Sequence, residues 1–211
     1  MTFFELNEIP DGSHLSKVVA EPRYFAERNC LWVALPEDIR IAGLPNVDYI
    51  DTENFVVLPI EFSTGTLEVD IYTVLAPDAA PEDRGFSGLA YHIDEALANF
   101  ESVYIRGTNG LKENPPAPRD ARAIQYFAFP DAKFDYLRDE FPGVYEAAAN
   151  LGLNEWITLR LEVAEHGVTS YINGEKVLVV DGSLGKTASG KVGLRVDIGS
   201  EAYFSNLRIT N

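Results

Sequence analysis

Cysteine and basic residues are scarce in this chain. Cys30 is the one cysteine, so no disulfide bond can form within the chain. Lys and Arg number 17 against 33 Asp and Glu, which gives a formal net charge of −16. Nucleic acids and anionic membranes both attract proteins through basic surfaces. We therefore expect neither as a partner, and we interpret the acidic charge as a source of solubility.

Long apolar runs are also absent. No stretch approaches the roughly 18 apolar residues that a membrane-spanning helix needs. The N-terminal sequence MTFFELNEIPDGSHL lacks the basic and apolar regions of a signal peptide, and we expect a cytoplasmic protein. With 46 % hydrophobic residues, the 211-residue chain has enough apolar side chains for a sizeable core. Its length suits one all-β domain, and we predict a single domain over residues 1–211.

The common catalytic motifs are missing as well. The chain has no G-x-S-x-G sequence, no glycine-rich phosphate loop, and no His-x-Glu or Cys-x-x-Cys spacing for zinc. His14 and His166 lie in turn-like segments, and we expect both in solvent. Cys30 lies in the apolar run CLWVAL and is predicted to be a buried strand residue. Any active site must then be built from residues that the fold brings together.

The chain has instead many short alternating runs separated by Gly, Pro, Asn and Asp. Asn173-Gly174 between two such runs predicts a β-hairpin, because a type I′ turn needs positive φ at both central positions. About ten strands suit two stacked sheets, which is the all-β sandwich of the jelly-roll kind. The expected strands are residues 66–74, 87–93, 101–106, 123–128, 156–163, 168–172, 176–180, 191–197 and 202–210.

Two segments interrupt the strand pattern. Residues 107–122 carry three prolines and are predicted to form a long loop. Residues 130–155 contain the sequence YEAAAN, which predicts one short helical insertion around 142–150 with a stop signal at Asn150 to Gly152. The second segment is rich in aromatic residues, including Phe134 and Tyr136. We expect these to be ordered, either capping a binding groove or forming a satellite core.

The strand sequences resemble those of concanavalin A-like lectin/glucanase domains. Phe62–Asp70 (FSTGTLEVD) matches a common strand of that superfamily. Its C-terminal strands are similar to WITLRLEV at 156–163, YING at 171–174, GKVGL at 190–194 and AYFSNLRI at 202–209. The similarity extends to laminin-G-like domains and the 3-keto-disaccharide hydrolase group, with further likeness to uncharacterised bacterial members. It implies the fold but leaves lectins, hydrolases, lyases and adhesive modules open.

The same resemblance bears on metals and on mechanism. Superfamily members often hold a structural calcium, so such an ion stays open here, with Asp181 and Asp197 as faint candidate ligands. No other cofactor is expected. Retaining glucanases of this fold place three acids on one strand face as E-x-D-x-E. Glu68 and Asp70 match the first two positions, but Tyr72 takes the third, which argues against that mechanism.

Strand alternation predicts a polar groove on the outer face of one sheet. The side chains expected to share it are Glu68, Asp70, Tyr72, His92, Tyr104, Arg106 and Gln125. Tyr136 is predicted to add an aromatic contact to a ligand in this groove. Glu68 and Asp70 have an equally plain interpretation as the outward polar face of an ordinary strand.

The residue types in the predicted groove suit β-elimination. His92 is the candidate general base near neutral pH, and Tyr104 the candidate acid for a leaving oxygen. Arg106 is expected to bind a substrate carboxylate, and Gln125 to help neutralise it. Alginate-lyase-type jelly rolls use these residue types, although their sequence motifs are absent here. The structural alternatives are a buried sheet histidine at His92 and a salt bridge from Arg106 to Glu68 or Asp70.

Three functions therefore stay open. The first is a carbohydrate-active enzyme with lyase-like acid/base chemistry in the groove. The second is a non-catalytic glycan-binding module. The third is a small-molecule lyase, isomerase or cyclase in which the long segments close the groove into a pocket. All three predict a glycan or small-molecule ligand, and none fixes the oligomeric state.

Overall fold

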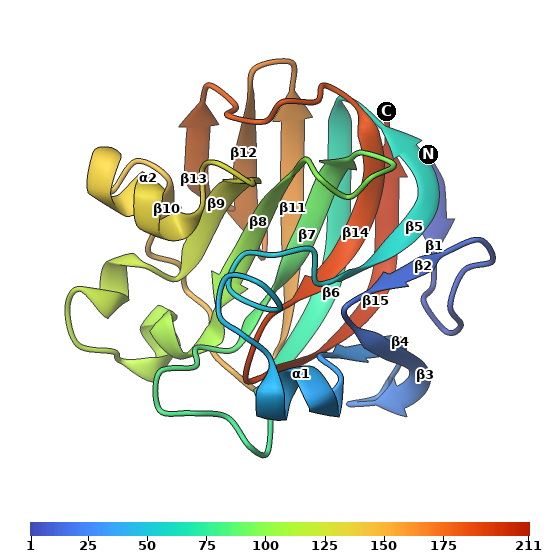
Figure 1. Cartoon of the computed structure of the whole chain (residues 1–211), viewed down its shortest axis with the longest axis horizontal. Helices are drawn as coiled ribbons and strands as arrows, with labels where there is room; N and C mark the ends of the chain where they lie inside the picture. Colours follow the sequence, from blue (N-terminus) through green and yellow to red (C-terminus); the bar gives the residue numbers. More distant parts are fainter.

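The computed structural model describes all residues, 1–211, and consists of two antiparallel sheets packed face to face (Figure 1). One sheet has eight strands, in the order β13 (Glu175–Asp181), β12 (Gly167–Ile172), β11 (Trp156–Ala164), β6 (Gly65–Leu75), β15 (Ser200–Thr210), β4 (Arg28–Ala34) and β3 (Val19–Phe25), with β1 (Thr2–Phe4) paired to β15. The other has seven, in the order β10 (Glu146–Ala147), β9 (Ile124–Phe129), β8 (Phe100–Arg106), β7 (Phe86–Ile93), β14 (Gly190–Val196), β5 (Phe55–Phe62) and β2 (His14–Ser16).

The core lies between the two sheets and follows from strand alternation. On β6, Leu67, Val69 and Ile71 are fully buried, whereas the residues between them face away from the core. On β8, Val103 and Ile105 are buried on the inner side in the same way. Burial of each such side chain contributes roughly 1.5–3 kcal/mol. The jelly-roll sandwich predicted from the sequence is therefore confirmed.

The local predictions agree with the structure in most places. Asn173 and Gly174 have φ values of 51° and 85° and join β12 to β13, as the hairpin signal predicts. Cys30 is buried on β4. The predicted loop at 107–122 contains three short 3-10 helices: η1 (Gly107–Asn109), η2 (Leu111–Glu113) and η3 (Arg119–Ala121).

The helix predicted around 142–150 is wrong in position. The helix of this segment is α2 (Phe134–Glu140), and Glu146–Ala147 forms strand β10 instead. The backbone of this stretch pairs with the edge of β9: Ala123 N–H donates to Ala147 O at 2.8 Å, and Tyr126 N–H to Tyr145 O at 2.9 Å. Pairing with an exposed sheet edge overrides the helical preference of the alanines. A second helix, α1 (Glu37–Ala42), was not predicted.

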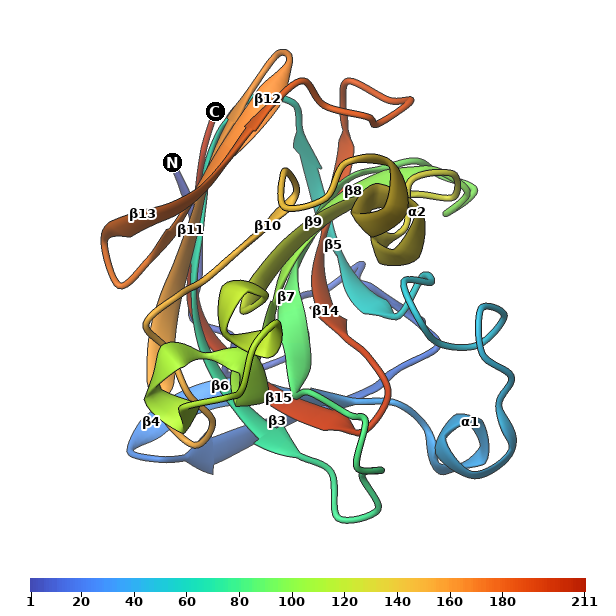
Figure 2. The ribbon, with the colours of Figure 1, turned by 90° about the vertical axis from the view of Figure 1, so that its left-hand side faces the viewer.

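The two α-helices lie on one side of the sandwich. Figure 2 shows α1 and α2 on the side of the seven-stranded sheet that faces away from the eight-stranded sheet. None of the helices has both the length and the apolar character needed to span a bilayer. The outer face of the seven-stranded sheet is thus the one face that the connections enclose.

Candidate functional site

A cavity of about 610 Å³ lies on this enclosed face. Its size falls within the usual range for small-molecule sites, about 300–1,000 Å³. Strands β7 and β8 contribute Phe86, Tyr104 and Arg106 to its lining. The rest comes from four connections, at residues 40–51, 78–84, 109–122 and 134–138, and from residues 197–199 after β14.

Alternation along β8 explains why Tyr104 and Arg106 reach this cavity. Val103 and Ile105 point into the core, so the two residues between and beyond them point outward. Both are nevertheless buried, at 3 % and 5 % exposure, because the connections cover them. The cavity therefore holds a phenol and a guanidinium in a largely water-excluded setting.

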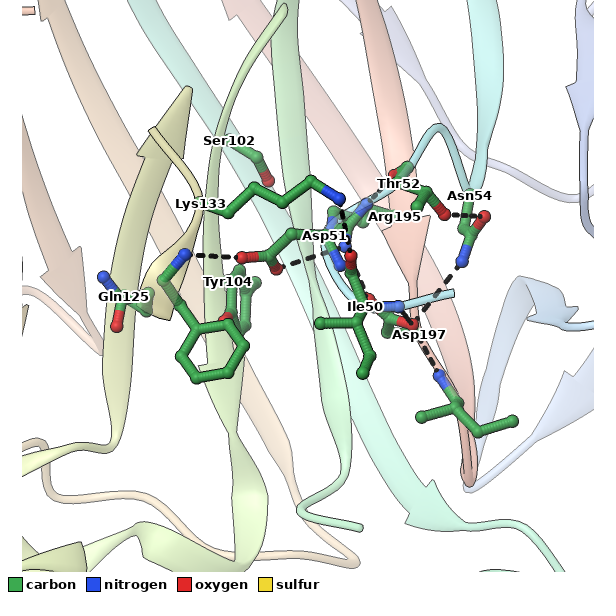
Figure 3. A network of polar contacts seen from close by, with 12 residues as sticks. Ile50, Asp51, Thr52, Asn54, Ser102, Tyr104, Gln125, Lys133, Arg195 and Asp197 are labelled. Atoms are coloured by element: carbon green, nitrogen blue, oxygen red, sulfur yellow. Dashed lines mark hydrogen bonds and ion pairs between the residues drawn. The ribbon is translucent and has the colours of Figure 1, made fainter. Parts of the chain in front are cut away.

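A buried charge network forms one wall of the cavity (Figure 3). The Asp197 carboxylate accepts the backbone N–H of Ile50 at 3.0 Å and of Asp51 at 2.9 Å. It also accepts Arg195 Nη2 at 2.7 Å, and Arg195 Nη1 donates to the Thr52 carbonyl. Arg195 lies 3.5 Å from Asp51 Oδ1. A single arginine is thus shared by two buried carboxyl groups.

The backbone at this wall is strained. Ile50 and Asp51 have φ values of 70° and 50°, in the left-handed region that a β-branched residue rarely enters. Such residues cost of order 1–3 kcal/mol each and persist only where the surroundings hold them. Here the two N–H groups of the strained residues both donate to Asp197. These hydrogen bonds hold the strained backbone and keep Asp51 at the cavity wall, where its Oδ2 accepts the Phe134 N–H at 3.0 Å.

Asp51 is the buried acid best suited to proton transfer. Burial raises the pKa of its carboxyl group above the ordinary value of 3.8; the charge of Arg195 opposes this shift and that of Asp197 adds to it. A carboxyl with a raised pKa can exchange a proton nearer neutral pH than an exposed one. Asp51 is 2 % exposed, so any proton it takes comes from a group inside the cavity.

Tyr104 is the matching donor. Burial raises the pKa of its hydroxyl, although the charge of Arg106 opposes the shift, so it stays protonated. Arg106 Nη2 donates to the Tyr104 hydroxyl oxygen at 2.9 Å, which leaves the hydroxyl proton for a ligand. Arg106 also stabilises the phenolate that would form after proton donation.

Arg106 belongs to a cluster of cations around one acid. It donates to Gln125 Oε1 at 3.2 Å and lies 3.7 Å from Glu146 Oε2. Glu146 also binds Arg138 at 2.7 Å and Arg122 at 3.0 Å. One carboxylate therefore faces three guanidinium groups, and this side of the cavity keeps positive charge.

The structure brings together only part of the groove predicted from the sequence. Tyr104 and Arg106 line the cavity, and Gln125 supports Arg106 from the neighbouring strand. Tyr136 lies on α2 but is 47 % exposed and does not line the cavity, whereas Phe134 does. The aromatic contribution of α2 therefore comes from its first residue, Phe134, and not from Tyr136.

The prediction that Glu68, Asp70 and Tyr72 share this groove is wrong. Their alternation is as expected, but β6 pairs with β11 and β15, whereas β7 and β8 belong to the other sheet. The outer faces of the two sheets point in opposite directions, so the outward residues of β6 lie on the other side of the sandwich from those of β8. Asp70 accepts hydrogen bonds from three side chains, and Glu68 pairs with Arg208 at 3.2 Å. These acids form the outward polar face of an ordinary strand, the alternative that the sequence had left open.

His92 is also separated from the cavity. A bulge in the β7–β14 pairing and a φ of 54° at His92 break the alternation of β7. The ring lies between two acceptors, Glu101 Oε1 at 2.9 Å from Nδ1 and the Ser63 carbonyl at 2.6 Å from Nε2. Both ring nitrogens are therefore engaged within the protein, and His92 does not line the cavity. The geometry corresponds to the buried sheet histidine of the structural alternative.

Sequence reasoning missed the acid of this site and most of its arginines. Asp51 follows an irregular stretch and carries no motif. Asp197 stood out only as a faint calcium ligand, yet its oxygens bind Arg195 and three backbone N–H groups. No group of three or more His, Cys, Asp or Glu side chains is arranged to hold a metal. One signal was present: residues 106–138 carry four arginines in an otherwise acidic chain.

Comparisons with known proteins relate this domain to carbohydrate-related families. A family model described as the 3-keto-alpha-glucoside-1,2-lyase-like domain matches residues 50–210. No curated protein sequence is similar enough to count as a relative. The matched range contains the strained Asp51, Tyr104 and every cavity arginine except Arg40.

Solved structures share the fold at low sequence identity. A glycosyl hydrolase-like protein from Parabacteroides distasonis is 16 % identical, with all of both chains covered and a TM-score of 0.59. The carbohydrate-binding module CBM66 from Bacillus subtilis is 15 % identical, covering 92 % of this chain and 94 % of that one, at a TM-score of 0.57. A β-glucanase from Bacillus licheniformis is 10 % identical, covering 100 % and 97 %, at a TM-score of 0.53. At these identities the likeness extends to the fold alone.

Proposed function

The chain belongs to the family of 3-keto-α-glucoside-1,2-lyase-like domains, and from this membership we propose that it is a lyase acting on a small 3-keto sugar. The observation that carries the proposal is the convergence on one cavity of a buried acid, a protonated phenol and a guanidinium, namely Asp51, Tyr104 and Arg106. These are a proton acceptor, a proton donor and a cation. β-Elimination next to a carbonyl needs these three functions.

The proposed reaction removes the proton on C2 of the sugar. A carbonyl at C3 acidifies that C–H bond, and the Asp51 carboxylate takes the proton. The electron pair of the C2–H bond becomes the C1=C2 double bond as the C1–O bond to the leaving group breaks. The leaving oxygen takes the Tyr104 hydroxyl proton. Asp51 then loses its proton and Tyr104 regains one, so that the enzyme returns to its starting state.

Arg106 and Gln125 support this chemistry from the floor of the cavity. Arg106 Nη2 lies 2.9 Å from the Tyr104 oxygen, so it stabilises the phenolate when the proton leaves. Gln125 Oε1 accepts from the same Nη2 at 3.2 Å and fixes the guanidinium. Charge that develops on the substrate carbonyl oxygen is stabilised by neighbouring guanidinium groups. Pre-arranged donors of this kind lower the barrier without reorganisation.

The limited volume of the cavity, which long connections border, favours a short substrate over a polymer. The two long segments predicted from the sequence, 107–122 and 130–155, both supply lining residues, including Arg119 and Phe134. This closure is what the third hypothesis, a small-molecule lyase, requires. A cavity of about 610 Å³ suits a mono- or disaccharide derivative.

Product identification tests the proposal. The chain would be incubated with methyl 3-keto-α-glucoside in water enriched in ¹⁸O, and the products followed by ultraviolet absorbance and mass spectrometry. Elimination gives an unsaturated keto sugar that absorbs ultraviolet light, and no ¹⁸O enters C1 when the C1–O bond breaks. Prompt ¹⁸O incorporation at C1 without an absorbing product would show hydrolysis instead. Binding without turnover would favour the glycan-binding module, whose fold-level relative is CBM66.

A further inference from the structure

Arginine is concentrated at the cavity out of proportion to the chain as a whole. The chain has a net charge of −16 and eleven arginines. Six of them line the cavity: Arg40, Arg84, Arg106, Arg119, Arg122 and Arg138. Clustered guanidinium groups repel one another, so such a cluster is stable only where anions compensate it. The partners of each arginine therefore indicate whether the protein itself supplies those anions.

Four of the six have a carboxylate partner within the protein. Arg40 pairs with Asp78. Arg106, Arg122 and Arg138 share Glu146. The protein supplies at least part of the compensating charge for these four.

Arg84 and Arg119 have no carboxylate partner. Arg84 Nη1 donates to two backbone carbonyls, Pro81 O at 2.7 Å and Asp83 O at 2.9 Å. Arg119 donates from Nε to Asn109 Oδ1 at 2.9 Å, and from Nη2 to the carbonyl and hydroxyl oxygens of Thr108 at 2.9 and 3.0 Å. A guanidinium has five N–H donors, so each group keeps donors that face no protein acceptor. The neutral acceptors hold both groups in place without neutralising them.

The two guanidinium groups also interact with each other. Burial lowers the pKa of Arg84, and the neighbouring charges of Arg119 and Arg106 lower it further, whereas the charges of Asp83 and Glu82 oppose the shift. None of the acids that line the cavity forms a salt bridge with Arg84 or Arg119. Asp51 and Asp197 share Arg195, and the buried carboxylate of Asp83 accepts the Ala80 N–H at 2.7 Å. The wall therefore holds two neighbouring guanidinium groups that no carboxylate pairs with directly.

We propose that Arg84 and Arg119 form an oxyanion-binding subsite, and that the ligand of this cavity is an acidic carbohydrate bearing a carboxylate or a phosphate group. The planar fork of a guanidinium matches either group through two parallel N–H···O bonds. The subsite lies beside Arg106 and shares the cavity with Asp51 and Tyr104, so the anionic group orients the sugar against them. The inference rests on the proposed function only for the identity of the reacting sugar. The anion-binding subsite itself is argued from Arg84 and Arg119 alone.

Calorimetry with defined probes tests the subsite without requiring turnover. Glucuronate, glucose 6-phosphate and glucose would be titrated into the intact chain. We expect one of the two acidic sugars to bind at least about 10-fold more tightly than glucose, and the tighter one identifies carboxylate or phosphate as the group. Equal binding of all three sugars would overturn the proposal.

Single substitutions locate the subsite. Arg84→Gln and Arg119→Gln are each expected to weaken binding of the tighter acidic sugar by about 10- to 100-fold and to leave glucose binding unchanged. Arg208→Gln, an exposed arginine on the other sheet, is the matched control. Arg84→Lys keeps the positive charge but removes the paired N–H donors of the guanidinium. This variant replaces Arg84→Gln in the test if Arg84→Gln fails to fold. Undiminished binding in folded Arg84 and Arg119 variants would refute the assignment.

The outcomes separate the two proposals. If the unsubstituted chain bound acidic sugars no more tightly than glucose but eliminated the neutral keto-glucoside normally, the subsite would be overturned and the lyase kept. Selective acidic-sugar binding that depends on Arg84 and Arg119, with no elimination of any keto sugar, would keep the subsite and overturn the lyase.

Discussion

Replacing Asp197 with alanine is expected to destabilise the protein strongly. Its carboxylate accepts three backbone N–H groups, those of Ile50, Asp51 and Ile198, at 3.0, 2.9 and 2.8 Å. It also holds Arg195, which is 1 % exposed, at 2.7 Å. Without it, the only polar partners left to the guanidinium would be Asp51 at 3.5 Å and the Thr52 carbonyl. The strained φ angles at Ile50 and Asp51 would lose the groups that hold them.

The magnitude follows from the burial of these groups. Removing one partner of a buried ion pair costs about 3–5 kcal/mol, because the other charge stays buried without compensation. That is a large part of the 5–15 kcal/mol by which a domain is usually stable. For about 200 residues it corresponds to a fall in Tm of roughly 6–20 °C. Urea unfolding and thermal melting would both measure it.

Asp70→Ala is the matched control. Asp70 also has three polar partners, Arg28 at 2.7 Å, Thr158 at 2.7 Å and Asn206 at 3.0 Å, but it lies on the outward face of β6. A partly exposed carboxylate of this kind contributes about 0–1 kcal/mol. Equal losses of stability in the Asp70 and Asp197 variants would refute the claim that burial makes the Asp197 network important.

Two further predictions concern pH and His92. Because burial raises the pKa of Asp51, activity is expected to fall as the pH falls through that raised value. The acidic limb of the pH–activity profile should therefore have its midpoint above 3.8. A midpoint at or below 3.8 would contradict the role of Asp51. The native state also binds the Asp51 proton more tightly than the unfolded chain. The contribution of Asp51 to the free energy of unfolding therefore falls as pH rises from its unfolded-state pKa to its native-state pKa. Urea unfolding at a series of pH values should show that this pH dependence is absent in Asp51→Asn. His92→Ala removes a buried hydrogen-bond partner of Glu101 and is expected to cost about 1–3 kcal/mol, while turnover well below the melting temperature stays unchanged. A large loss of turnover in folded His92→Ala would place His92 in the reaction after all.

The fold could be predicted because strand alternation and turn residues are local signals. In the runs at 66–74 and 156–163, the alternation of apolar and polar residues shows which side chains face the core. The Asn-Gly turn predicts one hairpin. The helix at 142–150 could not be judged in the same way. Whether YEAAAN forms a helix or a strand depends on whether a sheet edge is available, and here β9 supplies one.

The site was only half predictable for a related reason. Parity along a strand tells which side chains leave the core, and it identified Tyr104, Arg106 and Gln125 correctly as neighbours. Parity does not tell which sheet a strand joins, so Glu68 and Asp70 were assigned to the wrong face. It also fails at a bulge, which is why His92 turned elsewhere. Asp51 and Arg84 lie in connections, where the sequence has no period to read.

Turnover by Asp51→Asn tests the central claim most directly. The substitution keeps the size of the side chain and an oxygen that can accept the Phe134 N–H, but it removes the proton acceptor. With methyl 3-keto-α-glucoside and ultraviolet detection, we predict a loss of about 10²- to 10⁴-fold in kcat, while Asp70→Asn retains wild-type activity. If folded Asp51→Asn formed the unsaturated product at the wild-type rate, the proposed mechanism would be contradicted.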